Sequence, residues 1–140
     1  MVNWEKEIWT RNIANEQRCL IPINYLFQNR VFVNKMMTLT VVELKELLEA
    51  DKSIQLIDVR ESFEWDICHI EGAQLMPMNS IPDMMEDIDK NKRTVVYCHH
   101  GMRSQRVIDY LVREGFDNLL NLEGGIHAWA IQVDADMEKY

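Results

Sequence analysis

The residue types with the clearest chemical potential lie together in one short segment, Cys98-His99-His100-Gly101-Met102-Arg103-Ser104. The segment begins at the end of an apolar, β-branched run and leads into residues with helical spacing of apolar side chains. A thiol at such a junction faces the positive end of a helix and the free backbone N–H groups of the loop. Both favour the thiolate, which is the nucleophilic form of cysteine. We therefore expect Cys98 to be a catalytic nucleophile.

The rest of this loop is suited to hold a negative charge. Gly101 can adopt the positive φ that turns consecutive N–H groups toward one anion. Arg103 adds a permanent charge and a fork of donors suited to an oxyanion, and Met102 and Ser104 complete the loop. The alternative is that Cys98 is an ordinary buried thiol, but its position before a Gly/Arg loop and a helix favours a reactive one.

Two histidines follow the cysteine directly. His99 and His100 would add positive charge at mildly acidic pH, although we prefer to interpret them as exposed loop side chains. A metal site at Cys98-His99-His100 is disfavoured, because adjacent residues rarely point at one ion and no second Cys/His pair has zinc spacing. The sequence therefore predicts no metal and no cofactor.

The elements that must position this loop alternate along the chain. Thr40 and Glu43 have the spacing of a capping box for a helix whose apolar residues recur at helical intervals. Short, mainly apolar runs predict strands at residues 54–59, 73–76, 94–98 and 119–122, and the first of these is rich in β-branched residues. Helical patterns lie at residues 62–66, between Pro82 and residue 88, at 104–114 and at 126–130. This alternation predicts an α/β fold with a doubly wound parallel sheet and helices on both faces.

In open parallel sheets the functional crevice lies beyond the carboxyl ends of the strands. Asp58, Cys98 and Gly124 each end or follow a predicted strand, so we expect them at one edge of the sheet. We expect Asp58 and Arg60 to support the site through hydrogen bonds to the loop and to the neighbouring helix.

The composition limits the partners and the setting. The chain has 140 residues, 47% of them hydrophobic, which is enough for one domain with a real core. A formal net charge of −8 disfavours nucleic acid and anionic membranes as partners. Three cysteines are too few for a disulfide scaffold and indicate reduced thiols. Because the chain also lacks an apolar stretch of the roughly 20 residues that span a bilayer and a secretion signal at its start, we expect a cytoplasmic protein.

The charge and element patterns divide the chain into three parts. These are an N-terminal extension of uncertain structure (residues 1–37), a domain (residues 38–132) and a C-terminal tail (residues 133–140). The extension contains two tryptophans, which favours docking on the domain or on a second copy, as in a homodimer. The alternative is that the compact domain starts near Met36-Met37 and that an upstream start codon adds the residues before it.

Local patterns within the extension are weak. Trp4, Ile8 and Ile13 are spaced to line one face of a short helix opened by Asn3. Extended segments are predicted at residues 21–23 and 30–33.

The order and spacing of several motifs resemble those of single-domain rhodanese-like proteins, a sulfurtransferase family. The motifs lie at residues 56–61 (Leu-Ile-Asp-Val-Arg-Glu), 69–73 (His-Ile-Glu-Gly-Ala), 98–104, 115–116 (Gly-Phe) and 124–129 (Gly-Gly-Ile-His-Ala-Trp). The resemblance implies a rhodanese-like, mostly parallel five-stranded sheet with strand order 1-5-4-2-3, and it identifies Cys98 as a persulfide carrier. It gives no support for a role of the N-terminal extension.

The resemblance implies a sulfurtransferase that works in two steps. Cys98 would take a sulfane sulfur from a small anionic donor, thiosulfate or a persulfide, that Arg103 orients. It would pass the sulfur to cyanide, a small thiol or a protein thiol. Related cell-cycle phosphatases share the fold, but their loop has five residues between the cysteine and the arginine, because tetrahedral phosphate needs a wider ring. In this chain four residues separate Cys98 from Arg103, which disfavours a phosphatase. A non-catalytic or sulfur-relay binding module is the other alternative.

Several further residues are assigned structural roles. Cys68 stands where the family usually has glycine, and we interpret it as an inert thiol rather than a resolving thiol for Cys98. His69 is interpreted as a structural histidine and Trp129 as a core residue, whereas Cys19 has no assigned chemistry. The methionines expected to pack in the core are Met76, Met78, Met84 and Met85.

Overall fold

The computed structural model describes residues 8–11, 18–21 and 37–140. The chain divides into two compact units, residues 1–36 and residues 37–140, which are described separately.

In the first unit, β1 (Ile8–Arg11) pairs antiparallel with β2 (Arg18–Ile21), with Ile8 opposite Ile21. The predicted helix through Ile8 is therefore wrong, whereas the extended conformation predicted for Ile21 is confirmed. Ile8, Trp9 and Thr10 are β-branched or aromatic, and such residues favour a strand when a partner strand pairs with them. The remaining predictions for the extension, at Asn3, Trp4, Ile13, residues 22–23 and residues 30–33, lie outside the described residues.

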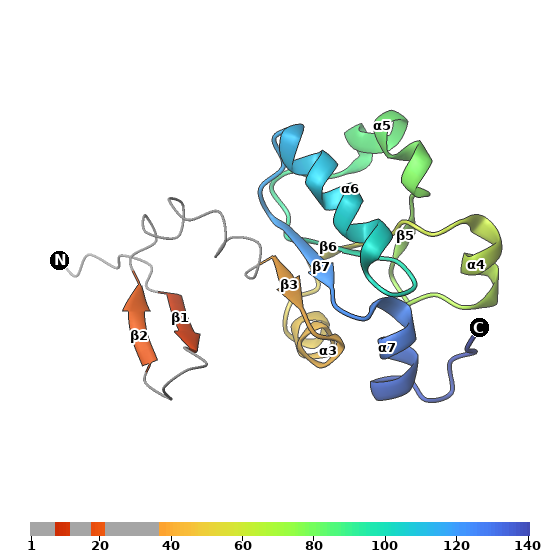
Figure 1. Cartoon of the computed structure of the whole chain (residues 1–140), viewed down its shortest axis with the longest axis horizontal. Helices are drawn as coiled ribbons and strands as arrows, with labels where there is room; N and C mark the ends of the chain where they lie inside the picture. Colours follow the sequence, from red (N-terminus) through yellow and green to blue (C-terminus); the bar gives the residue numbers. More distant parts are fainter. Residues whose placement is uncertain (1–7, 12–17, 22–36) are drawn as a thin grey trace. The chain divides into compact units, whose positions relative to one another are not determined.

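The second unit contains a five-stranded parallel sheet in the order β3-β7-β6-β4-β5 (Figure 1). The strands are β3 (Thr38–Leu39), β4 (Gln55–Asp58), β5 (Gln74–Leu75), β6 (Thr94–Tyr97) and β7 (Leu119–Leu122). Numbered within this unit the order is 1-5-4-2-3, which confirms the predicted topology, and every pair is parallel. The four strands predicted from residue patterns are present, whereas the short β3 is expected only from the family resemblance.

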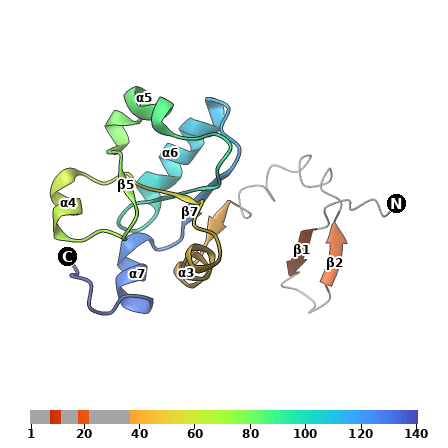
Figure 2. The same ribbon diagram turned by 180° about the vertical axis from the view of Figure 1, so that it is seen from behind.

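The helices are α3 (Val41–Ala50), α4 (Ser62–Ile67), α5 (Ile81–Met84), α6 (Met102–Arg113) and α7 (Gly125–Gln132), with 3-10 turns at η1 (Met78–Ser80) and η2 (Met85–Asp87). They surround the sheet, as Figure 2 shows from behind. None of the helices in the described part of the chain is both long enough and apolar enough to cross a membrane.

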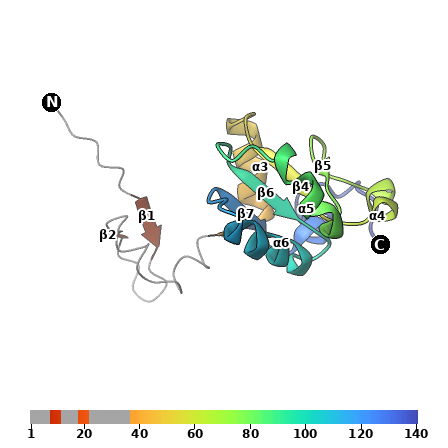
Figure 3. The same cartoon turned by 90° about the horizontal axis from the view of Figure 1, so that it is seen from above.

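The two faces of the sheet carry separate cores, because successive side chains of a strand point in opposite directions. Val95 and Tyr97 pack in one core with residues of α3 and α7. Val96 and Cys98 pack in the other with residues of α6 and α5. In the view from above, β6 lies between α3 and α6 (Figure 3). Helices on both faces are therefore confirmed.

The predicted core residues take the expected places. Trp129 is buried against α3 and the first face of the sheet. Met76 is fully buried in the second core, and the other three predicted methionines, Met78, Met84 and Met85, are partly buried and pack against that core.

The capping box at the start of α3 is confirmed. The amide of Thr40 donates to Glu43 Oε2 at 2.7 Å, and the amide of Glu43 donates to Thr40 Oγ1 at 3.3 Å. These reciprocal bonds satisfy two N–H groups that the first turn of a helix leaves unpaired. They fix where the chain leaves β3 and enters α3.

Three helices begin earlier than predicted, and for α7 the difference is the single residue Gly125. The helix predicted from Ser104 starts at Met102, because Gly101 with a φ of 102° turns the chain directly into α6. The helix predicted after Pro82 starts at Ile81, so the proline lies in the first turn, where its missing N–H leaves no hydrogen bond unmade.

Candidate active site

Cys98 lies at the carboxyl edge of the sheet, directly after β6, and its side chain is only 1% exposed. Asp58 ends the neighbouring strand and pairs with Tyr97, while Gly124 follows β7 on the other side of β6. The three segments predicted to meet at one edge of the sheet therefore do so.

Hydrogen-bond donors of the loop surround the Cys98 sulfur. The amide of Gly101 donates to Sγ at 3.1 Å, and the Ser104 hydroxyl oxygen lies 3.5 Å from it. Burial alone would raise the pKa of the Cys98 thiol, but the hydroxyl and amide of Ser104 and the amides of Gly101 and His100 outweigh burial and lower this pKa. A lowered pKa increases the thiolate fraction at neutral pH.

Asn121, in β7, determines how the Ser104 hydroxyl can bond. Its Nδ2 donates to the Gly101 carbonyl at 3.1 Å, which leaves Oδ1 to accept from the Ser104 hydroxyl at 2.6 Å. A hydroxyl has one hydrogen. That hydrogen goes either to Asn121 Oδ1 or to the Cys98 sulfur, and only the bond to sulfur lowers the pKa of Cys98. Donation to a thiolate requires the hydroxyl to rotate away from Asn121.

Two glycines permit the close packing of this loop. Gly101 has a φ of 102°, in the region that side chains other than glycine rarely adopt, and this conformation brings its amide to the sulfur. Gly125 has a φ of 57°, and a Cβ there would collide with the carbonyl oxygens of Cys98 and His99. Only glycine at position 125 therefore lets the start of α7 lie directly against the loop.

Backbone hydrogen bonds join α7 to the loop at this contact. The amide of Ile126 donates to the Cys98 carbonyl at 2.9 Å, and the amide of His127 donates to the His99 carbonyl at 3.1 Å. Two of the N–H groups that a helix leaves unpaired in its first turn are satisfied by the loop in this way.

Arg103 forms a two-bond ion pair with Glu64 of α4. Its two terminal nitrogens donate to the two carboxylate oxygens, each at 2.7 Å. Hydrogen bonds from Arg103 hold the pKa of the Glu64 carboxyl down, at about 2, against the opposing effect of burial. The same bond raises the pKa of Arg103. The Arg103 side chain remains 33% exposed, so it is the cation of the loop that solvent can reach.

Arg60 is completely buried and holds α4 in place. Its guanidinium donates to both carboxylate oxygens of Asp58, with a shortest distance of 2.6 Å, to the Glu64 carbonyl at 3.2 Å and to the Cys68 carbonyl at 2.7 Å. Burial alone would lower the pKa of Arg60, but its hydrogen bonds to Asp58 reverse that effect. Because Arg60 bonds to the carbonyls of Glu64 and Cys68 as well as to Asp58, it anchors α4, the helix that places Glu64 beside the loop.

Tyr140 connects the C-terminal residues to the same network. Its hydroxyl accepts from Arg60 at 2.6 Å and donates to Glu64 Oε1 at 2.9 Å. Its ring stacks on the His99 ring, with centroids 4.5 Å apart and planes 18° apart. The residues beyond α7 thus form part of the site.

The other residues singled out in the sequence lie at the surface of the site or beside it. His99 is half-buried and His100 and Met102 are exposed. His69 is exposed, stacks on Trp65 and has its Nδ1 3.1 Å from the Trp65 carbonyl oxygen, as a structural histidine would.

Both cysteines of the second unit are free thiols. Cys68 is half-buried, and burial raises the pKa of its thiol, in contrast to Cys98. The side chain of Cys19 lies outside what the structure describes.

The sequence assigns no role to four residues of the site, Glu64, Asn121, Tyr140 and His127, although His127 lies in the motif at residues 124–129. A local signal exists only for Asn121, which is a polar residue within an otherwise apolar strand, Leu-Leu-Asn-Leu. The others are ordinary surface types whose partners lie far away in sequence, such as Glu64 and Arg103, 39 residues apart.

Comparisons with known proteins agree with this geometry. The Rhodanese-like domain family matches residues 40–132. Thiosulfate sulfurtransferase GlpE of Shewanella oneidensis is 35% identical over 91 residues, which cover 65% of this chain and 89% of that protein. YtwF of Bacillus subtilis is 46% identical over 86 residues, which cover 61% of this chain and 82% of that protein.

The match to MoeZ of Mycobacterium tuberculosis, 39% identical over 105 residues, covers 74% of this chain but spans only 27% of that longer protein. A rhodanese-like domain protein from Staphylococcus aureus has a similar crystal structure, with a TM-score of 0.63 and 40% identity, covering 66% of this chain and 89% of that one. The fold, the cysteine loop and these matches lead to one conclusion: the chain belongs to the family of rhodanese-like domains.

Proposed function

We propose that this protein transfers sulfane sulfur through a persulfide on Cys98. The observation that carries the proposal is the buried Cys98 sulfur, which accepts a hydrogen bond from the Gly101 amide at 3.1 Å inside a loop of further amide donors. Fixed amide donors stabilise a negative charge without having to reorganise when it forms. The loop therefore suits an anionic sulfur, either a thiolate or a persulfide.

In the first step, the Cys98 thiolate attacks the outer sulfur of thiosulfate. A new S–S bond forms to Cys98, the S–S bond of thiosulfate breaks, and sulfite leaves with the electron pair. In the second step a nucleophile, such as cyanide or a thiolate, attacks the outer sulfur of the persulfide and releases the Cys98 thiolate. A small persulfide can replace thiosulfate as the donor with the same balance of atoms and electrons. This sequence predicts ping-pong kinetics.

The assigned roles of the surrounding residues follow from their contacts. The amides of His100, Gly101 and Ser104 hold the charged sulfur. Arg103, which is 33% exposed and held by Glu64, attracts the anionic donor to the loop. Asp58 and Arg60 hold α4, which carries Glu64. The named relative GlpE is a thiosulfate sulfurtransferase, which supports thiosulfate as the first donor to test.

Mass spectrometry after incubation with thiosulfate tests the proposal. We expect one added sulfur atom on Cys98 in the wild type and in Cys68→Ser, and none in Cys98→Ser. Cyanide should then remove the added sulfur as thiocyanate. Cys68→Ser is the matched control because Cys68 is a second free thiol of the same unit.

Two results would contradict the proposal. One is thiocyanate formation by Cys98→Ser at the wild-type rate. The other is a folded wild-type protein that takes up no sulfur from thiosulfate or from a small persulfide, which would favour a binding module instead.

A further inference from the structure

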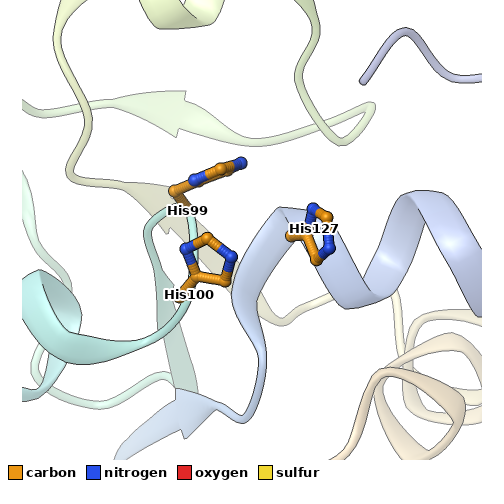
Figure 4. A group of neighbouring side chains, drawn as sticks. All are labelled: His99, His100 and His127. Carbon is orange, nitrogen blue, oxygen red and sulfur yellow. The ribbon is translucent and has the colours of Figure 1, made fainter. Parts of the chain in front are cut away.

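Three of the four histidines of the chain converge at one place. His99 and His100 come from the cysteine loop and His127 from the first turn of α7, as Figure 4 shows. Each ring has a nitrogen within 4.8 Å of a nitrogen of the other two. The ring centroids of His99 and His100 are 4.1 Å apart, and those of His100 and His127 are 4.9 Å apart.

The backbone holds the two segments that carry these rings together. The His127 amide donates to the His99 carbonyl at 3.1 Å, and the Ile126 amide donates to the Cys98 carbonyl at 2.9 Å. Gly125 permits this approach because it has no Cβ to collide with those carbonyls. The fold therefore fixes how closely the two segments that carry the rings approach each other.

The His99 ring is further positioned by Tyr140, which stacks on it with the ring planes 18° apart. A neutral imidazole has a free lone pair on one ring nitrogen, which is the form that binds metal ions.

Although the sequence alone predicts no metal, the convergence with His127 changes the conclusion: we propose that His99, His100 and His127 form a binding site for a divalent late transition metal ion, with Zn²⁺ as the reference ion. Imidazole nitrogen is a preferred ligand of Zn²⁺, Ni²⁺ and Cu²⁺. Zn–N bonds are about 2.0–2.1 Å long, so tetrahedral ligand nitrogens lie about 3.3 Å apart. The ring nitrogens, which lie within 4.8 Å of one another, would have to approach to that spacing, and the exposed His100 side chain has room to rotate.

This site is chemically separate from the sulfur site. The Cys98 sulfur is buried and already accepts hydrogen bonds from the loop, whereas the three imidazoles supply all the protein ligands of the proposed ion. The remaining coordination positions are left to water or to an anion. The site uses His127, a residue without a part in the sulfur-transfer steps.

Calorimetric titration of the full chain with Zn²⁺ tests the inference, with Cys98→Ser as a parallel sample. We expect one equivalent to bind with the same affinity, within about threefold, in both proteins, because sulfur is not a ligand. His127→Ala should weaken binding by at least about tenfold, since a ligand is lost. His100→Ala should do the same, and because the His100 side chain is exposed, this substitution should leave the fold intact. His69→Ala is the matched control and should bind like the wild type, because His69 is the fourth histidine and contacts Trp65 instead.

Titration with Co²⁺ distinguishes nitrogen from sulfur ligands, because thiolate ligation adds an intense charge-transfer band in the near ultraviolet. We expect no such band. The inference is overturned if Zn²⁺ shows no saturable binding, if both His127→Ala and His100→Ala bind as tightly as the wild type, or if a thiolate band appears and is lost in Cys98→Ser. Because Cys98→Ser cannot form the persulfide, metal binding by this variant is measured independently of the proposed sulfur transfer.

Discussion

The rings of Tyr140 and His99 lie face to face, 4.5 Å apart between centroids. One belongs to the C-terminal residues and the other to the cysteine loop, so the stack ties the end of this unit to its candidate active site. The Tyr140 hydroxyl extends the connection to Arg60 and Glu64. The Tyr140 side chain thus contacts the cysteine loop at His99, the buried Arg60 and the α4 residue Glu64.

Replacing Tyr140 separates its two kinds of contact. Tyr140→Phe keeps the ring and loses both hydrogen bonds, which should lower the free energy of unfolding by about 1 kcal/mol. Tyr140→Ala also loses the stack and should cost about 1 kcal/mol more. Chemical denaturation of the two variants checks this order. Equal stability of the wild type and Tyr140→Ala would show that the C-terminal contact contributes nothing.

The ion pair of Glu64 and Arg103 predicts a dependence of stability on pH. The pKa of Glu64 is lowered from 4.5 to about 2 by hydrogen bonds from Arg103. A lowered folded-state pKa stabilises the fold fully above the unfolded value, and this contribution is lost as the pH falls from about 4.5 toward 2. Glu64→Gln should therefore lower the free energy of unfolding by about 1–3 kcal/mol at pH 7.

The difference between wild type and Glu64→Gln should shrink when thermal unfolding is repeated at progressively lower pH below 4.5. Glu71→Gln, at an exposed glutamate, is the control and should differ little from the wild type at any pH. A Glu64→Gln difference that stays constant down to pH 3 would argue against the ion pair as its cause.

Asn121 and Ser104 should be energetically coupled. Asn121→Ala removes the Asn121 bond to the Ser104 hydroxyl and one of the two hydrogen bonds that the Gly101 carbonyl accepts, the other coming from the Gln105 amide, which should cost about 1–3 kcal/mol of stability. Ser104→Ala removes the other half of the Ser104–Asn121 bond. In a double-mutant cycle, the two losses together should be smaller than the sum of the single losses, because the shared bond is counted twice. Strict additivity would contradict the bond.

Gly125 and Gly72 form a matched pair of glycines with positive φ. A Cβ at Gly125 would collide with the carbonyls of Cys98 and His99, whereas a Cβ at Gly72 meets nothing within 4 Å. Gly72→Ala should therefore cost only about 1 kcal/mol for its backbone conformation. Gly125→Ala should cost more than that and also reduce sulfur transfer, since α7 must move away from the loop. Equal losses of stability in the two variants would count against close packing at position 125.

The two free thiols of the second unit should titrate on opposite sides of the ordinary cysteine pKa. The pKa of Cys98 is lowered from 9.0 by its hydrogen bonds, against the effect of burial, and that of Cys68 is raised by burial. The ultraviolet absorbance of thiolate, followed against pH, measures both. The Cys98 signal is the difference between wild type and Cys98→Ser, and the Cys68 signal is the difference between wild type and Cys68→Ser. A titration midpoint for Cys98 at or above that of Cys68 would contradict the hydrogen bonds that the loop donates to the Cys98 sulfur.

The sequence is sufficient for features that depend on neighbouring residues. Thr40 and Glu43, three residues apart, make a capping box in any helix that starts there. The run at residues 94–97 is apolar enough to be buried on both faces of a parallel sheet. The cysteine, glycine and arginine that follow it predict an anion-binding loop at the carboxyl edge of that sheet. The strand order follows from the resemblance to a known family rather than from these local patterns.

The helix predicted through Ile8, which is a strand in the structure, shows that local patterns are not sufficient to determine every element. Apolar spacing over a few residues is compatible with a helix or a strand, and pairing with β2 decides between them. The bonds of Glu64 to Arg103, Ser104 to Asn121 and Tyr140 to Glu64 join residues 39, 17 and 76 positions apart. The meeting of His127 with His99 depends likewise on α7 lying against the loop. Such contacts are absent from any local pattern, because only the packing of the helices on the sheet brings these side chains within bonding distance.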